Sequence, residues 1–143
     1  MLKKIPKILS PELVKTLMEM GHGDEIVIAD ANFPCHSVSD NVIRADGVSG
    51  CDMLRSILEL FPLDTYVEYP ACYMKVVDGD NFTPRIWSDY ERIFEFSDEN
   101  YKIEYLERFD FYERAKKSYA VIATGETEQY ANIILKKGVL RKS

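Results

Sequence analysis

GHGDEIVIADANFP, residues 21–34, is the stretch that decides the fold predicted for this chain. Its centre, Ile26 to Ala29, is rich in β-branched residues and has turn-forming residues on both sides, which is typical of a buried strand in an α/β sheet. Asp30 and Asn32 follow the carboxyl end of this strand, where open α/β sheets bind ligands. His22 precedes it, and histidine is well suited to move protons near neutral pH. The stretch therefore predicts a small polar site that performs proton transfer.

Helices and strands alternate on both sides of this strand. Ser10, Pro11 and Glu12 begin a helix with a capping serine, a proline at the first helical position and an acid in the first turn. Gly21 is expected to end that helix in the left-handed conformation, and the loop 31–41 is long enough to be functional. Further helices are predicted at 51–61, 84–96 and 109–117, and further strands at 42–45, within 65–77, and at 103–107, 119–123 and 132–135. This alternation predicts an α/β sandwich with a largely parallel sheet.

Length and composition limit the class of protein. With 143 residues, 46% of them hydrophobic, the chain has the size and the apolar content of one domain spanning residues 1–143. A formal net charge of -6 and a sequence pI near 5.0 argue against a nucleic-acid partner. Prolines interrupt the apolar part of the N-terminal MLKKIPKILSP, unlike in a signal peptide, and no stretch approaches the roughly 18 apolar residues of a transmembrane helix. We therefore expect a soluble, cytoplasmic protein with no membrane partner.

Few residues are available for thiol or metal chemistry. Cys35, Cys51 and Cys72 are odd in number and widely spaced, which favours reduced core thiols over disulfides or a zinc site. Because His22 and His36 are the only histidines, a histidine-rich metal site is excluded. Cys35 and His36 are adjacent, and neighbours in an extended chain point to opposite faces, which argues against a thiol and base pair.

Four segments together resemble one known family. GHGDEIVIADANFP (21–34), VIRADGV (42–48), RFDFYERAKKSYAVIATGE (108–126) and YANIILKKGV (130–139) are similar, in the same order, to the RbsD/FucU family of sugar mutarotases. The resemblance covers residues 3–139. It implies an RbsD-like three-layer α/β/α sandwich with a mixed sheet, and interconversion of the α and β anomers of a free sugar with no metal, redox step or cofactor. It also implies a toroidal homodecamer with sites at subunit contacts.

The same resemblance implies roles for individual residues. His22 matches the proton donor of the family, and the residues that match its sugar contacts are Asp30, Arg108, Tyr130, Ala131 and Asn132. The side-chain chemistry suits a polyol, since a carboxylate accepts hydrogen bonds from hydroxyl groups and a guanidinium can hold two hydroxyl oxygens. Histidine, with an unperturbed pKa of about 6.5, can act as acid or base at pH 7. Asn32 and Tyr119 are predicted as supporting residues, and Tyr119 or Phe109 is predicted to cover an apolar 6-deoxy methyl group.

The family has two branches that handle different sugars. Arg108 and the block 109–115 resemble the branch that acts on L-fucose, because D-ribose pyranases usually carry histidine at the position of Arg108. Ala131 departs from the fucose pattern, which usually has glycine there. Three other hypotheses stay open: a D-ribose pyranase-type mutarotase, a sugar-binding ring protein without catalysis, and a thiol enzyme that depends on Cys35.

Each candidate residue also has a purely structural interpretation. His22 follows a helix-ending glycine, as capping residues do, and Asp30 is placed to cap the next turn. Arg108 can form a surface ion pair with Glu107 or Glu104. The aromatic cluster within 109–112 is interpreted mostly as core.

The spacing between His22 and Asp30 poses a geometric problem. If residues 25–30 are extended, the strand spans roughly 17 to 20 Å, which is too far for both residues to contact one sugar. Either the loop 21–24 folds back along the strand, or the two residues come from neighbouring chains. The second arrangement agrees better with a site at a subunit contact.

Overall fold

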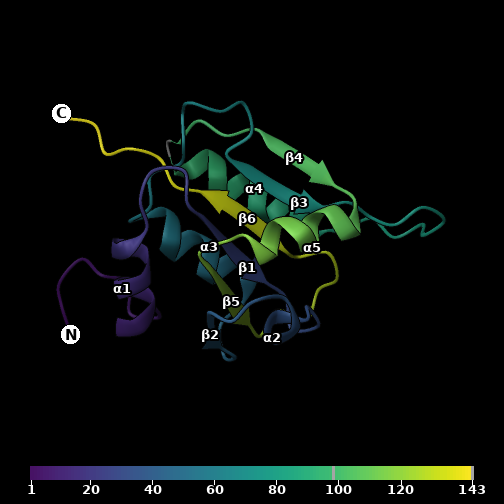
Figure 1. Ribbon diagram of the computed structural model, residues 1–143, viewed down its shortest axis with the longest axis horizontal. Helices are drawn as coiled ribbons and strands as arrows, with labels where there is room; N and C mark the ends of the chain where they lie inside the picture. The colour runs from purple at the N-terminus through teal and green to yellow at the C-terminus, as the bar shows by residue number, and fades with distance from the viewer. Residues whose placement is uncertain (98, 143) are drawn as a thin grey trace.

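The computed structural model describes residues 1–97 and 99–142 and contains a six-stranded mixed sheet with helices on both faces (Figure 1). The strands are β1 Glu25–Ala29, β2 Val42–Ala45, β3 Ala71–Met74, β4 Ile103–Leu106, β5 Ala120–Thr124 and β6 Ile133–Lys136. The helices are α1 Pro11–Glu19, α2 Cys35–Val38, α3 Gly50–Leu58, α4 Ile86–Phe96 and α5 Arg108–Lys116. In the described part of the chain, no helix is both long and apolar enough to cross a membrane.

The strand order is β2-β5-β1-β6-β3-β4. Only β6 runs antiparallel to its neighbours, β1 and β3, while the other pairs are parallel. The predicted largely parallel sheet is therefore confirmed. Because of the reversed direction of β6, its amino end lies at the same edge of the sheet as the carboxyl ends of the other strands. We call this edge the carboxyl edge and the opposite one the amino edge.

Alternate side chains of the central strand enter two different cores. Ile26 and Ile28 of β1 belong to the larger core cluster, which α1, α3 and α4 cover. Val27 and Ala29 belong to the smaller cluster on the other face, which α2 and α5 cover. In Figure 1, α5 lies in front of the sheet and α4 behind it. The three-layer sandwich is thereby confirmed.

The first helix begins as predicted and ends differently. The Ser10 side chain accepts a hydrogen bond from the helix, as a capping serine does. The prediction that Gly21 adopts a left-handed conformation is wrong: the chain turns away in an extended conformation at Met20, and Gly23 has the positive φ of 89°. The ammonium group of Lys137 donates to two carbonyls at the helix end, at 2.5 and 2.6 Å. Lys137 thus provides the hydrogen bonds to the last carbonyls of the helix that a left-handed cap would otherwise provide.

The predicted long loop 31–41 contains the short helix α2. Its four residues follow Pro34, and Cys35 packs into the smaller core cluster. One helical turn is too short to display a helical period in the sequence, which explains why the pattern did not predict it.

Candidate functional site

A cavity of about 280 Å³ lies at the carboxyl edge of the sheet. Its walls come from segments that follow β1 and β3, from the start of α5, and from the segment before β6, all of which meet at this edge. The lining residues are Asp30, Asn32, Phe33, Met74, Val77, Arg108, Tyr112, Gln129, Tyr130 and Asn132. The fold thus brings together five residues that the sequence singled out, namely Asp30, Asn32, Arg108, Tyr130 and Asn132.

Asp30 is the buried acid of this cavity, with 5% of its surface exposed. Its backbone N–H donates to Oδ1 of Asn132 at 2.8 Å, and its Oδ1 accepts from the Asn32 N–H at 3.0 Å. Burial raises the pKa of Asp30, and backbone N–H groups, including that of Ala131, offset this only in part. Additional donors, such as the hydroxyl groups of a polyol, would stabilise its charged form. Asp30 is thus a turn cap and a candidate ligand contact at once.

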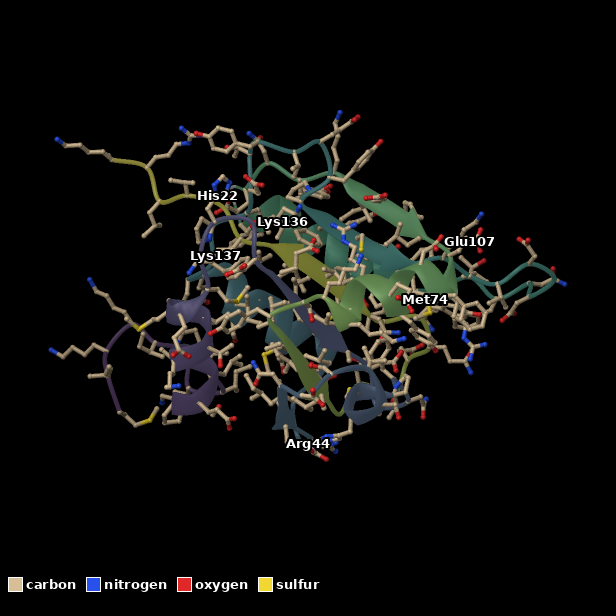
Figure 2. All side chains as sticks on the ribbon, in the orientation of Figure 1. His22, Arg44, Met74, Glu107, Lys136 and Lys137 are labelled. Carbon is tan, nitrogen blue, oxygen red and sulfur yellow. The ribbon has the colours of Figure 1, made fainter. Side chains whose placement is uncertain are left out.

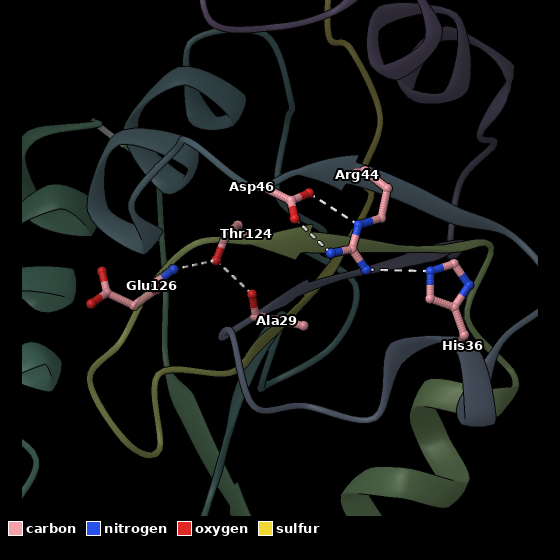
Figure 3. Close-up of polar contacts among 6 residues, drawn as sticks. All are labelled: Ala29, His36, Arg44, Asp46, Thr124 and Glu126. Atoms are coloured by element: carbon pink, nitrogen blue, oxygen red, sulfur yellow. Dashed lines mark hydrogen bonds and ion pairs between the residues drawn. The ribbon is translucent and has the colours of Figure 1, made fainter.

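The chain on both sides of Asp30 is held by the end of β5. The Thr124 hydroxyl donates to the Ala29 carbonyl at 2.6 Å and accepts from the Glu126 N–H at 3.2 Å (Figure 3). The Ala31 N–H donates to the Glu126 carbonyl at 2.7 Å. These bonds fix the exit of β1, and with it the position of the carboxyl group.

Arg108 is the first residue of α5 and lines the cavity. Its guanidinium group packs against two aromatic rings of the same helix. Its guanidinium carbon lies 5.5 Å from the ring centre of Phe109 and 5.6 Å from that of Tyr112. Its Nε donates to the Tyr112 hydroxyl at 3.2 Å. The two partners suggested by the structural interpretation pair elsewhere: Glu107 with Lys75 at 3.1 Å and Glu104 with Arg114 at 3.3 Å.

Tyr112 is a cavity residue that sequence reasoning missed. The aromatic cluster was predicted to be mostly core, and only Phe111 is fully buried, whereas Phe109 is 71% exposed and Tyr112 half-buried. A usable signal was present, since Tyr112 lies four residues after Arg108 and so shares its face of the helix. The apolar side of the cavity, Phe33, Met74 and Val77, was missed as well, because apolar lining and core look the same in a sequence.

Ala131, predicted as a sugar contact, is not among the residues that line the cavity. Its residue surface is 1% exposed, and its side chain packs into the larger core cluster. Its N–H is one of the groups that bond the Asp30 carboxylate. An alanine in place of glycine therefore leaves the polar contacts of this position intact.

His22 lies at the amino edge, outside the cavity. Its Nε2 is 3.0 Å from Oδ1 of Asp64, and its ring packs against Tyr66 at 5.1 Å between ring centres. Figure 2 shows His22 at one end of the sheet and Met74, which lines the cavity, at the other. The loop 21–24 does not fold back along β1, so one chain does not bring His22 and Asp30 together.

Asp64 determines which nitrogen of the His22 ring donates a hydrogen bond. Burial by itself would raise the pKa of Asp64, but hydrogen bonds from the Tyr66 N–H and from His22 outweigh burial and hold that pKa below its usual value. The Asp64 side chain is 3% exposed and that of His22 is 45% exposed. A carboxylate that accepts from Nε2–H leaves Nδ1 as the ring nitrogen that is not bonded to Asp64.

Tyr119, which was predicted to support the site, lies apart from the cavity, and Cys35 and His36 do not form a reactive pair. Tyr119 precedes β5 at the amino edge, where its N–H donates to the Glu25 carbonyl at 2.8 Å, so the length of the strand separates it from Asp30. Burial raises the pKa of the Cys35 thiol, which disfavours the nucleophilic thiolate. His36 contacts Arg44 at 3.3 Å (Figure 3).

Comparisons with known proteins agree over nearly the whole chain. The profile of the RbsD / FucU transport protein family matches residues 3–140. An L-fucose mutarotase of Haemophilus influenzae is 54% identical over 140 residues, which cover 97% of each chain. The structure of a fucose mutarotase from Streptococcus pneumoniae in complex with L-fucose is 57% identical, with a TM-score of 0.94 and coverage of 98% of this chain and 100% of that one. Bacillus subtilis RbsD complexed with D-ribose is 29% identical, with a TM-score of 0.69 over 93% and 95% of the two chains.

Proposed function

The chain belongs to the RbsD/FucU family, and we propose that it interconverts the α and β anomers of L-fucose, the reaction of an L-fucose mutarotase. The observation that carries this proposal is its full-length similarity to a fucose mutarotase solved with L-fucose. The carboxyl-edge cavity, whose lining combines polar hydrogen-bonding groups with an apolar wall, is consistent with a 6-deoxy sugar. Its volume also suits a monosaccharide better than a larger ligand.

The reaction needs one acid and one base. Protonation of the ring oxygen, with loss of the anomeric hydroxyl proton, opens the ring, and closure on the other face of the carbonyl gives the second anomer. Each positioned proton-transfer group contributes roughly 10²- to 10⁴-fold in rate. No bond other than the ring C–O bond is broken or made between heavy atoms.

The cavity residues bind and orient the sugar. Asp30 accepts from sugar hydroxyl groups, and Arg108 donates to their oxygens. Tyr130 and Asn132 donate and accept, while Ala131 contributes backbone. The apolar wall made by Met74, Val77 and Phe33 receives the methyl group at C6.

His22 reaches the sugar from a neighbouring copy. The cavity lies at the carboxyl edge and His22 at the amino edge, so a head-to-tail contact between two copies brings one His22 beside one Asp30. A head-to-tail contact that closes produces a ring, in which every copy gives its histidine to the next. The toroidal decamer is our proposal for the complete assembly.

Asp64 and Tyr112 complete the proton path. Asp64 holds Nε2–H of His22, so Nδ1 faces the neighbouring copy and exchanges the proton. Tyr112 accepts a hydrogen bond from Arg108, which leaves the proton of its own hydroxyl free to be donated within the cavity. We assign Tyr112 as the second proton-transfer group. We also propose that the reaction takes place in the cytoplasm, in keeping with three free thiols.

Saturation-transfer NMR at anomeric equilibrium tests the proposed function. We expect irradiation of the α-anomeric proton of L-fucose to reduce the β signal when the native protein is added, at a rate proportional to the protein concentration. D-ribose serves as the comparison sugar. Exchange of ribose alone would move the protein to the pyranase branch, and binding without any exchange would make it a sugar-binding ring protein.

A further inference from the structure

The turn 130–132 has an unusual backbone. Tyr130 has a φ of 60°, and among the described residues only Lys4 is another non-glycine residue with positive φ. The left-handed region is disfavoured for any side chain with a Cβ, and a bulky aromatic residue there is an outlier. Such a conformation persists only where its surroundings hold it in place.

Two side chains of α4 hold this turn. The Trp87 Nε1–H donates to the Tyr130 carbonyl at 2.8 Å, and the Tyr90 hydroxyl donates to the Ala131 carbonyl at 2.9 Å. Trp87 and Tyr90 are three residues apart and so lie on one face of the helix. They bind two consecutive carbonyls of the turn, which restricts its rotation about the backbone.

Both donors are themselves fixed by packing. The Trp87 ring stacks on Tyr73, with 5.3 Å between ring centres and 25° between planes. Tyr90 is fully buried, and its hydroxyl occupies space that only a glycine at position 50 leaves open, because a Cβ on Gly50 would lie 2.1 Å from that oxygen. Neither donor can turn away unless the larger core cluster repacks.

The turn carries the polar groups of the cavity. The side chain of Asn132 accepts from the Asp30 N–H at 2.8 Å, and the N–H of Ala131 bonds the Asp30 carboxylate. The Tyr130 ring stacks on Phe82 at 6.0 Å between ring centres. A rotation of the turn would therefore displace Tyr130 and Asn132, which line the cavity, and the groups that hold Asp30.

We propose that Trp87 and Tyr90 are positioning residues of the sugar site, which act by holding the left-handed turn 130–132 in its binding conformation before the sugar arrives. The inference rests on the proposed function for the identity of the sugar. Preorganisation of this kind increases affinity, because the bound geometry need not be selected from a flexible ensemble.

Tyr90→Phe tests the proposal, with Tyr73→Phe as the matched control. Both tyrosines are fully buried in the same core cluster, and the Tyr73 hydroxyl has no hydrogen-bond partner among the residues that the structure describes. We expect Tyr90→Phe to lower kcat/KM for L-fucose about tenfold, mainly through KM, because a small misplacement of binding groups is enough for such a loss. Tyr73→Phe is expected to stay within about twofold of the native protein.

A second readout does not depend on turnover. Trp87 is the only tryptophan of the chain, so its fluorescence reports on its environment beside the turn. We expect L-fucose to change this fluorescence in the native protein and in Tyr73→Phe, with a dissociation constant about tenfold weaker in Tyr90→Phe. Trp87→Phe, at a half-buried position, is expected to raise KM in the same way, and it keeps the test open if Tyr90→Phe does not fold.

The possible results separate this proposal from the proposed function. Equal KM and dissociation constants in folded Tyr90→Phe and Tyr73→Phe would overturn the positioning role, even if both variants exchange the anomers of fucose. Fucose binding without anomer exchange by the native protein would overturn the mutarotase assignment. In that case the difference between the two dissociation constants still decides the positioning role.

Discussion

Two buried aspartates at opposite edges of the sheet have opposite electrostatic environments. At the carboxyl edge, burial outweighs the hydrogen bonds of Asp30 and raises its pKa. At the amino edge, hydrogen bonds from the Tyr66 N–H and from His22 outweigh burial and lower the pKa of Asp64. Asp30 is thus a carboxylate that gains from further donors, as a ligand contact does. Asp64 already has its partner and serves to orient it.

In the proposed reaction, the two edges of the sheet have separate tasks. The carboxyl edge carries the cavity in which we propose that the sugar binds, and the amino edge carries the partly exposed imidazole of His22, whose Nε2 is bonded to Asp64. A parallel sheet keeps these edges apart by the length of a strand. Under the proposed mechanism neither edge is a complete site, so the reaction requires a contact between copies.

The largest expected effect comes from removing the imidazole at the amino edge. His22→Ala should lower kcat for fucose anomer exchange by about 10²- to 10⁴-fold, the usual contribution of one proton-transfer group, with little change in sugar binding. Saturation-transfer NMR measures the rate. His36→Ala is the control, since His36 is the other histidine and contacts Arg44 at the surface. Full activity of His22→Ala would show that the amino edge takes no part in the reaction.

The matching change at the carboxyl edge is Asp30→Asn. Loss of a charged hydrogen-bond acceptor should weaken fucose binding by about 10- to 100-fold. The substitution should also raise the free energy of unfolding, although it weakens binding. Because the folded pKa of Asp30 lies above its unfolded value, its ionisation destabilises the fold as pH rises between these two values, and asparagine removes this effect. Urea unfolding from pH 4 to 8 measures the free energy of unfolding of both proteins. We expect the variant's advantage over the native protein to grow as the pH rises, and an advantage that shrinks would contradict the raised pKa.

Mixing the two variants tests whether the edges meet across copies. His22→Ala retains the cavity and Asp30→Asn retains the imidazole, so a randomly mixed assembly should have about a quarter of its sites intact. Activity after joint refolding should therefore recover to about a quarter of the native value. If an assembly that is proven to contain both variants recovers no activity, His22 and Asp30 of one site come from the same chain.

Asp64→Asn should have a smaller effect on the reaction. The acceptor of the His22 Nε2–H would lose its charge and hold the ring less firmly, and we expect kcat to fall about tenfold with KM nearly unchanged. The folded pKa of Asp64 lies below its unfolded value, so its stabilising contribution is present above the unfolded pKa and is lost as pH falls through the folded pKa. The variant should accordingly be less stable than the native protein at pH 7, and the two should converge in acid. Thermal unfolding at pH 7 and pH 3 measures this.

The smallest effect is expected at Cys35, whose thiol packs in the smaller core cluster and does not line the cavity. Cys35→Ala should leave kcat/KM within about twofold of the native value, because a small core substitution affects stability more than chemistry. Abolished exchange in a folded variant would revive the thiol mechanism.

Local signals account for what could be predicted. The strand β1 and the helix α4 were predicted almost to the residue, because apolar periodicity over several residues is a local property. The end of α1 was mispredicted, because the cap at its carbonyls is the ammonium of Lys137, far along the chain. Tyr112 was assigned to the core because its position in the cavity depends on how α5 packs on the sheet.

The sequence by itself determined that an acid follows a buried strand, that a histidine precedes it, and that helices alternate with strands around them. These features depend on residue order and side-chain type alone. Only the tertiary structure decided that β6 runs antiparallel, which brings Asn132 beside Asp30 over 102 residues of chain, and that His22 turns to Asp64 instead. Such pairings result from the burial of both faces of one sheet, a property of the whole chain that no single segment contains.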